Sequence, residues 1–136
     1  MFPDRTFEII FHRENARTQF FNKDFNSARL SYFKWIESVK QQNINTSGQL
    51  DEEFKLAEEE YSEFVKSDPL YLKICESVLP IIKEIPGILQ TELYKAFPDI
   101  NKNDISYSLY FATKHGILTR TKNGRTYEVL INSNQN

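Results

Sequence analysis

The stretch Gly116–Ile131, GILTRTKNGRTYEVLI, decides how the second half of the chain folds. Two runs rich in β-branched residues, Ile117 to Thr121 and Arg125 to Ile131, flank the turn-forming pair Asn123-Gly124. Asn-Gly between two such runs predicts a β-hairpin with a type I′ turn. Three basic residues lie at or near the end of this hairpin: Arg120, Lys122 and Arg125.

Helices are predicted immediately before the hairpin. Asn101 is a good helix N-cap, and Asp104 follows it where a negative charge suits the positive end of a helix. Gly116 supplies the left-handed residue that ends a helix. The buried stripe of this helix is expected at positions three and four apart: Ile105, Leu109 and Ala112.

Two further helices are expected upstream. Apolar spacing predicts one from Leu70 to about Lys83, which Pro80 should either kink or divide. A break at Glu84–Gly87 follows. A short helix, Glu92 to Phe97, should then begin after a capping Thr91 and end before proline.

The first half of the chain is predicted to be a helical hairpin. Apolar residues at helical spacing predict helices from Asp24 to Gln42 and from Leu50 to Lys66, and a short polar loop favours an antiparallel pair. Phe7–Phe11 fits either a strand or the start of another helix. Asp68-Pro69 suits a helix start and marks a boundary between regions 1–68 and 69–136.

Charge differs between the two halves. The chain of 136 residues has a formal net charge of -2, which argues against binding nucleic acid through bulk positive charge. Through Pro69 there are 9 Lys and Arg against 13 Asp and Glu, whereas from Leu70 onward there are 8 against 6. The basic excess therefore lies in the half that contains the hairpin.

Composition excludes several classes of protein. Aromatic residues make up 14% of the chain, too many for a disordered one, and no apolar run is long enough to span a membrane. A single cysteine, Cys75, and the absence of a leader pattern predict a cytoplasmic protein. His12 and His115 are the only histidines, and no metal-ligand spacing, phosphate loop or activated nucleophile is recognisable, so no cofactor, metal site or enzyme activity is expected.

The order of elements from Leu89, LQTELYKAFPDINKNDISYSLYFATKHGILTRTKNGRTYEVLI, resembles a winged helix-turn-helix domain of bacterial and archaeal transcription regulators. The resemblance covers roughly the second half of the chain. It implies a mainly α fold, in which an N-terminal helical hairpin precedes three helices and a β-hairpin wing.

The resemblance also implies a set of DNA contacts. In DNA-binding members the third helix enters the major groove, and the wing contacts the backbone or the adjoining minor groove. The face of that helix departs from the usual pattern because it has no arginine, the residue that most often reads guanine. Carried onto this sequence, the expected DNA-binding residues are Lys102, Asn103, Ser106, Tyr107, Tyr110, Lys114, Arg120, Lys122 and Arg125.

Binding by one copy would be weak, since three or four neutralised phosphates give a salt slope of only about -3. The favoured interpretation is therefore a homodimeric regulator on double-stranded DNA, with the aromatic N-terminal helices as the dimer or partner surface. The alternative is a protein-interaction adaptor, in which the Tyr-rich third helix and the acidic helical hairpin dock on a protein and the wing is incidental.

Overall fold

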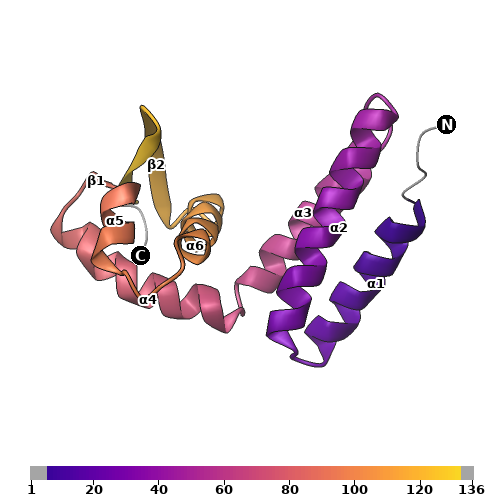
Figure 1. Cartoon of the computed structure of the whole chain (residues 1–136), viewed down its shortest axis with the longest axis horizontal. Helices are drawn as coiled ribbons and strands as arrows, with labels where there is room; N and C mark the ends of the chain where they lie inside the picture. Colours follow the sequence, from indigo (N-terminus) through magenta and orange to yellow (C-terminus); the bar gives the residue numbers. More distant parts are fainter. Residues whose placement is uncertain (1–5, 133–136) are drawn as a thin grey trace. The chain divides into compact units, whose positions relative to one another are not determined.

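The chain forms two compact units, Met1–Asp68 and Pro69–Asn136, termed unit 1 and unit 2. A computed structural model describes residues 6–132, and its helices and strands are drawn in Figure 1. Within that range the chain is mainly helical with one small antiparallel sheet, which confirms the prediction of a mainly α protein.

Unit 1 contains three helices rather than the predicted pair: α1 (Thr6–Phe21), α2 (Phe25–Asn45) and α3 (Asp51–Val65). The two predicted helices are confirmed as α2 and α3. The segment left open, Phe7–Phe11, is helical and belongs to α1. A hairpin was therefore an incomplete description of this half, because α1 packs along α2 as a third helix.

Aromatic side chains form the core of unit 1. Tyr32 and Trp35 of α2 and Tyr61 and Phe64 of α3 are all at most 6% exposed. The Tyr32 ring stacks on Tyr61 with centroids 5.6 Å apart and lies 5.1 Å from that of Phe64. Aromatic pairs at such distances add to the free energy of burial, so this cluster holds α3 on α2.

Three arginines tie the helices of unit 1 together. Arg29 donates two hydrogen bonds of 2.7 Å to the buried carboxylate of Asp68. Arg13 pairs with Glu53 at 3.3 Å. Arg17 of α1 likewise donates to both carboxylate oxygens of Glu60 on α3. The pairs from Arg13 and Arg17 show that long side chains bridge α1 and α3.

Unit 2 packs three helices against a three-stranded sheet. Strand order is β1-β3-β2, with β3 in the middle and both pairings antiparallel. Its elements are α4 (Pro69–Glu84), β1 (Ile88–Leu89), α5 (Gln90–Ala96), α6 (Lys102–Lys114), β2 (Leu118–Asn123) and β3 (Thr126–Ile131).

Strand β1 was not predicted because two residues are too short to show alternation. Its position follows from Gly87, whose φ of 83° turns the chain and whose N–H donates to the Val129 carbonyl at 3.0 Å. Ile88 then pairs with Val129 and Leu89 with Glu128. The break predicted at Glu84–Gly87 is thus the turn that leads into β1.

The helices of unit 2 follow the expected pattern with two corrections. α4 runs through Pro80, which lies exposed, as a single helix. The expected cap at Thr91 is wrong, because α5 begins at Gln90 and the Thr91 N–H donates to the Thr126 hydroxyl. The predicted stripe of α6 is confirmed, since these side chains are fully buried: Ile105, Leu109 and Ala112.

The hairpin loop lies one residue later than predicted. Asn123 pairs with Thr126, so the two loop residues are Gly124 and Arg125. Gly124 has a φ of 62°, whereas Asn123 and Arg125 are not among the residues with positive φ. A glycine with positive φ at the first loop position is typical of a type II′ turn, not the predicted type I′. Turns of type I′ and type II′ both match the twist of the strands, so the sequence alone did not show which of the two types forms.

Candidate nucleic-acid interface

Helix α6 presents one polar face. Its start is fixed by Asn101, whose side-chain oxygen accepts a hydrogen bond from the Asn103 N–H at 2.7 Å, as predicted for an N-cap. The residues predicted to contact DNA on this helix lie away from its buried stripe. The exposed ones are Lys102, Asn103, Tyr110 and Lys114. The half-buried ones are Ser106 and Tyr107.

The two tyrosines of this face rest on a buried ring. Tyr107 and Tyr110 each pack edge-on against Phe111, with centroids 5.2 and 5.0 Å apart. Phe111 is only 5% exposed, so it supports both rings from below. Tyr110 keeps 44% of its surface exposed. This arrangement leaves one aromatic surface in the middle of the polar face.

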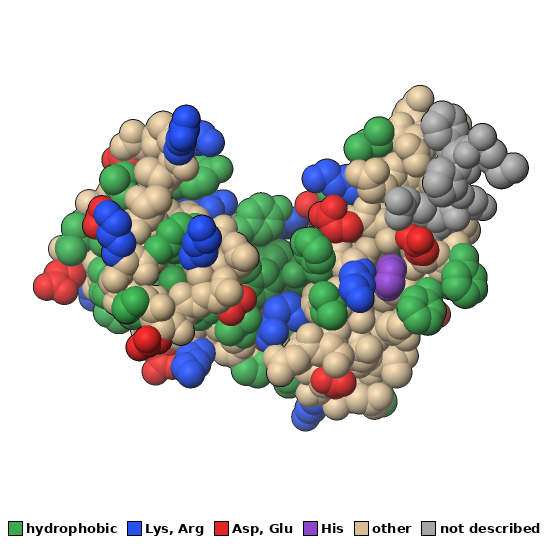
Figure 2. All heavy atoms as spheres, in the orientation of Figure 1, with side chains coloured by type: hydrophobic (Ala, Val, Ile, Leu, Met, Phe, Trp, Pro, Cys, Tyr) green, Lys and Arg blue, Asp and Glu red, His purple; other side chains and the backbone are tan. Residues whose placement is uncertain are grey.

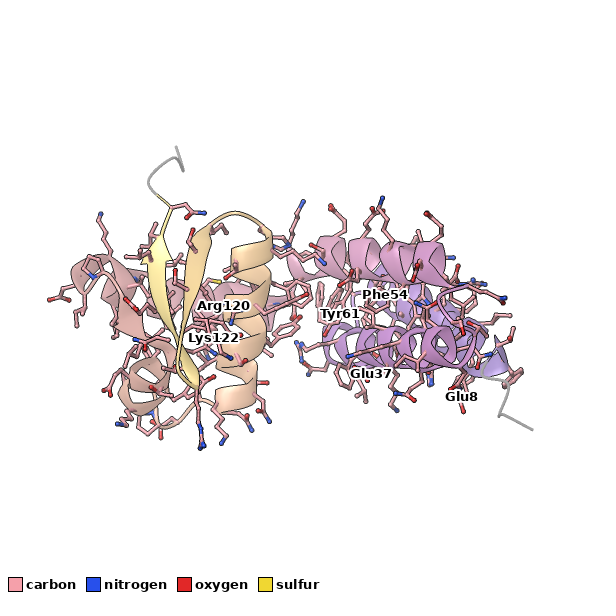
Figure 3. All side chains as sticks on the ribbon, turned by 90° about the horizontal axis from the view of Figure 1, so that it is seen from above. Glu8, Glu37, Phe54, Tyr61, Arg120 and Lys122 are labelled. Carbon is pink, nitrogen blue, oxygen red and sulfur yellow. The ribbon has the colours of Figure 1, made fainter. Side chains whose placement is uncertain are left out.

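Two cations of the hairpin lie on the face of β2 that packs against the core at its base. Side chains alternate along a strand, so Arg120 and Lys122 point to the same side of β2 as the buried Leu118. Tyr127 lies directly opposite Lys122 on β3. Figure 3 shows Arg120 and Lys122 on the side of β2 that faces α6. The inner face of the hairpin therefore changes from apolar at its base to basic near its end.

Arg120 links four parts of unit 2. Its guanidinium lies 4.5 Å from the Tyr127 ring centroid and 6.0 Å from that of Tyr110. Its Nη1 donates to the Gln90 side-chain oxygen at 3.1 Å, and the Gln90 amide donates to the Tyr94 hydroxyl at 2.6 Å. Gln90 is only 5% exposed. We call this set the corner cluster: Gln90, Tyr94, Tyr110, Arg120, Lys122 and Tyr127.

The other hairpin cations are more accessible. Lys122 is exposed, and its ammonium lies 5.3 Å from the Tyr127 ring centroid. Arg125 is exposed in the loop. Within residues 6–132 neither Lys122 nor Arg125 forms a salt bridge. Figure 2 shows blue Lys and Arg side chains gathered at the end of the hairpin. These two charges are thus free to meet an anionic partner.

From the sequence, Arg120 was expected to act like the other two hairpin cations, and its contacts with Gln90 and Tyr127 were not predicted. The alternation of side chains between the two faces of β2 indicates which residues point inward. Leu118 is buried, and a residue two positions later on the strand shares its face. The structure therefore gives Arg120 an intramolecular role that its charge alone did not indicate.

A second polar cluster lies in the interior of unit 2. The hydroxyl of Tyr71 lies 3.3 Å from His115 Nδ1 and also forms a side-chain hydrogen bond with Cys75. Burial raises the pKa of the Cys75 thiol and that of the Tyr71 hydroxyl. A thiol that stays protonated is a poor nucleophile, so this cluster favours a packing role.

Comparisons of the chain with protein-family models, with curated proteins and with solved structures found no match. Among the residues that the structure describes, none of the helices is both long and apolar enough to cross a membrane. In the same range no three His, Cys, Asp or Glu side chains come together as a metal site.

Proposed function

We propose that unit 2 is a winged helix-turn-helix domain that binds double-stranded DNA as a transcriptional regulator. One observation carries the proposal. Arg120 lies between Tyr110 of α6 and Tyr127 of β3, so the polar face of α6 and the basic face of the hairpin join into one surface. A helix flanked by a basic hairpin has the shape that fits a major groove and the phosphate backbone beside it.

In this proposal the helix and the hairpin have different tasks. Asn103 at the start of α6 suits adenine, and Ser106 with Tyr110 can donate to bases or phosphates. Lys122 and Arg125 neutralise phosphates on the backbone or in the adjoining minor groove. Arg120, which is held by Gln90 and two tyrosine rings, fixes the hairpin against α6 instead of reaching the DNA itself.

Two copies strengthen such binding. A single unit 2 neutralises about three phosphates, which corresponds to a salt slope near -3 and weak affinity at physiological ionic strength. A homodimer on a pseudo-palindromic site roughly doubles this electrostatic contribution. Exposed aromatic side chains on unit 1, among them Phe7 at 79% and Phe11 at 51%, supply apolar surface for self-association.

The same exposed aromatics favour one alternative function, that of a protein-interaction adaptor. Unit 1 contributes 13 of the 19 acidic residues, and Tyr110 adds an exposed ring on unit 2. In this alternative the chain binds a protein partner and has no affinity for DNA. The two functions differ in one measurable property, the affinity for duplex DNA, which only the regulator has and which should fall as salt rises.

The test is a fluorescence anisotropy titration of the full chain against a random duplex at about 50 and 200 mM salt. The double variant Lys122→Ala with Arg125→Ala should bind at least about tenfold more weakly at the lower salt. The matched control is Lys73→Ala with Lys83→Ala, which removes two exposed cations of α4 outside the interface. Equal losses in both double variants, or no binding at low salt, would exclude the proposed interface.

A further inference from the structure

Unit 1 contains an open pocket that the proposed DNA contacts do not use. Its volume is about 430 Å³, within the range of small-molecule sites. Residues of all three helices line it, so it exists only when unit 1 is folded. The lining side chains are Arg17, Phe20, Phe21, Tyr32, Glu60 and Glu63.

Three of the six lining residues are aromatic, and they form the apolar walls of the pocket. Phe20 is held by edge-on contacts with Tyr32 at 6.4 Å and with Phe64 at 5.2 Å between centroids. Phe21 is 86% exposed, an unusual position for a large apolar ring. Burial raises the pKa of Tyr32 to about 12, so its hydroxyl stays neutral at physiological pH. A bound molecule with a flat apolar body would cover Phe21 and pack against Phe20.

The charges of the pocket favour a cation. Arg17 is neutralised by its two hydrogen bonds to Glu60, and its guanidinium lies 5.6 Å from the Trp35 ring centroid. The charge of Arg17 thus already lies over an aromatic ring, although Trp35 is buried and does not line the pocket. Glu63 adds a second carboxylate, which among the described residues pairs with Lys66 alone, in an exposed contact of 3.2 Å. Exposed pairs of this kind contribute little and exchange readily, so Glu63 can accept another cation.

From these observations we infer that the pocket binds a small organic cation, an ammonium or guanidinium on a flat apolar body. The apolar body packs against Phe20 and Phe21, and the positive charge lies near Glu63. Aromatic faces are electronegative and attract cations, so the walls and the carboxylate act in the same direction. This inference is independent of DNA binding by unit 2.

The first experiment compares two probes of similar shape and opposite charge. The full chain is titrated by calorimetry with phenethylamine, which is cationic at neutral pH, and with phenylpropionate, which is anionic. Phenethylamine should bind at least about fivefold more tightly. Equal affinities, or no saturable binding of phenethylamine below about 10 mM, would overturn the inference.

Variants locate the site. Phe21→Ala and Glu63→Gln should each weaken phenethylamine binding about fivefold, the effect expected for the loss of one aromatic packing contact or one exposed charge contact. The matched controls are Phe33→Ala and Glu59→Gln, which change exposed residues outside the pocket lining and should leave affinity unchanged. If the controls weaken binding as much as the pocket variants, the cation does not bind in this pocket.

A further variant should reverse the selectivity. Glu60→Gln removes the carboxylate that neutralises Arg17 and leaves a positive charge in the lining. Phenylpropionate should then bind as well as phenethylamine or better. Thermal unfolding of the variant confirms that unit 1 is folded during the titration. A folded Glu60→Gln chain with the original cation preference would show that these charges do not control the pocket.

Discussion

Replacement of Arg120 by methionine separates two roles that a cation in the hairpin could have. Methionine keeps most of the length of the side chain but removes its charge and its donors. If Arg120 positions the hairpin, the variant should lower the stability of unit 2. If Arg120 contacts a phosphate, the variant should instead change how DNA binding depends on salt. The two outcomes are measured independently.

The contacts of Arg120 determine how much the free energy of unfolding should fall in Arg120→Met. Arg120→Met removes a charged hydrogen bond to the buried Gln90, of the kind that contributes about 2 kcal/mol, and a contact with Tyr127 of about 1 kcal/mol. A loss of about 2 to 3 kcal/mol in the free energy of unfolding should lower the melting temperature of a unit of this size by roughly 10 to 15 °C. Lys122→Met, at an exposed position, should lower that free energy by less than about 1 kcal/mol.

The salt dependence should behave in the opposite way. Each lost phosphate contact reduces the slope of log K against log salt by about 0.9. Lys122→Met should show this reduction, whereas Arg120→Met should weaken binding without changing the slope. Thermal unfolding and amide exchange in β2 and β3 report the stability effect even without DNA. An Arg120→Met chain that melts like the wild type and loses about 0.9 of slope would refute the positioning role.

Two further predictions concern stability. Asp68→Asn should destabilise unit 1 by about 3 kcal/mol in chemical denaturation, because it leaves the Arg29 guanidinium beside a neutral and fully buried amide. Unit 2 should lose stability as pH rises above about 8.5, the ordinary pKa of a thiol, since the unfolded chain then releases protons that folded Cys75 and Tyr71 retain. Cys75→Ala should delay this loss toward the ordinary pKa of tyrosine, about 10, and an unchanged pH profile would contradict the assignment.

The sequence predicted a helix best where a single apolar stripe and a clear N-cap define it. Ile105, Leu109 and Ala112 recur at helical spacing and Asn101 is a strong cap, so α6 was predicted almost to the residue. Helix α1 was harder because its apolar residues do not form one stripe. Phe7 and Phe11 are exposed and stack on each other, whereas the buried positions are only Ile9 and Ala16.

The corner cluster shows a different limit of sequence reasoning. A hydrogen bond between Arg120 and Gln90 joins residues 30 positions apart, and its existence depends on how α5 packs on the sheet. Charge alone placed Arg120 with Lys122 and Arg125 as equivalent cations. Strand alternation places Arg120 and Lys122 on the same face of β2, so it does not separate them. They differ in distance from the loop, because Arg120 pairs with Val129 and Lys122 with Tyr127, and the loop was predicted one residue away from its true position.

The short strand β1 supports only part of the hairpin. It pairs with β3 at Val129 and Glu128, so the outer part of the hairpin, which carries Lys122 and Arg125, is a two-stranded ribbon. Two-stranded ribbons have little stability of their own. We expect the end of the hairpin to bend under small loads while its base, with Arg120, stays fixed. In the proposed complex with DNA, such a ribbon would follow the local path of a phosphate backbone at low cost, which would leave discrimination between sequences to the polar face of α6.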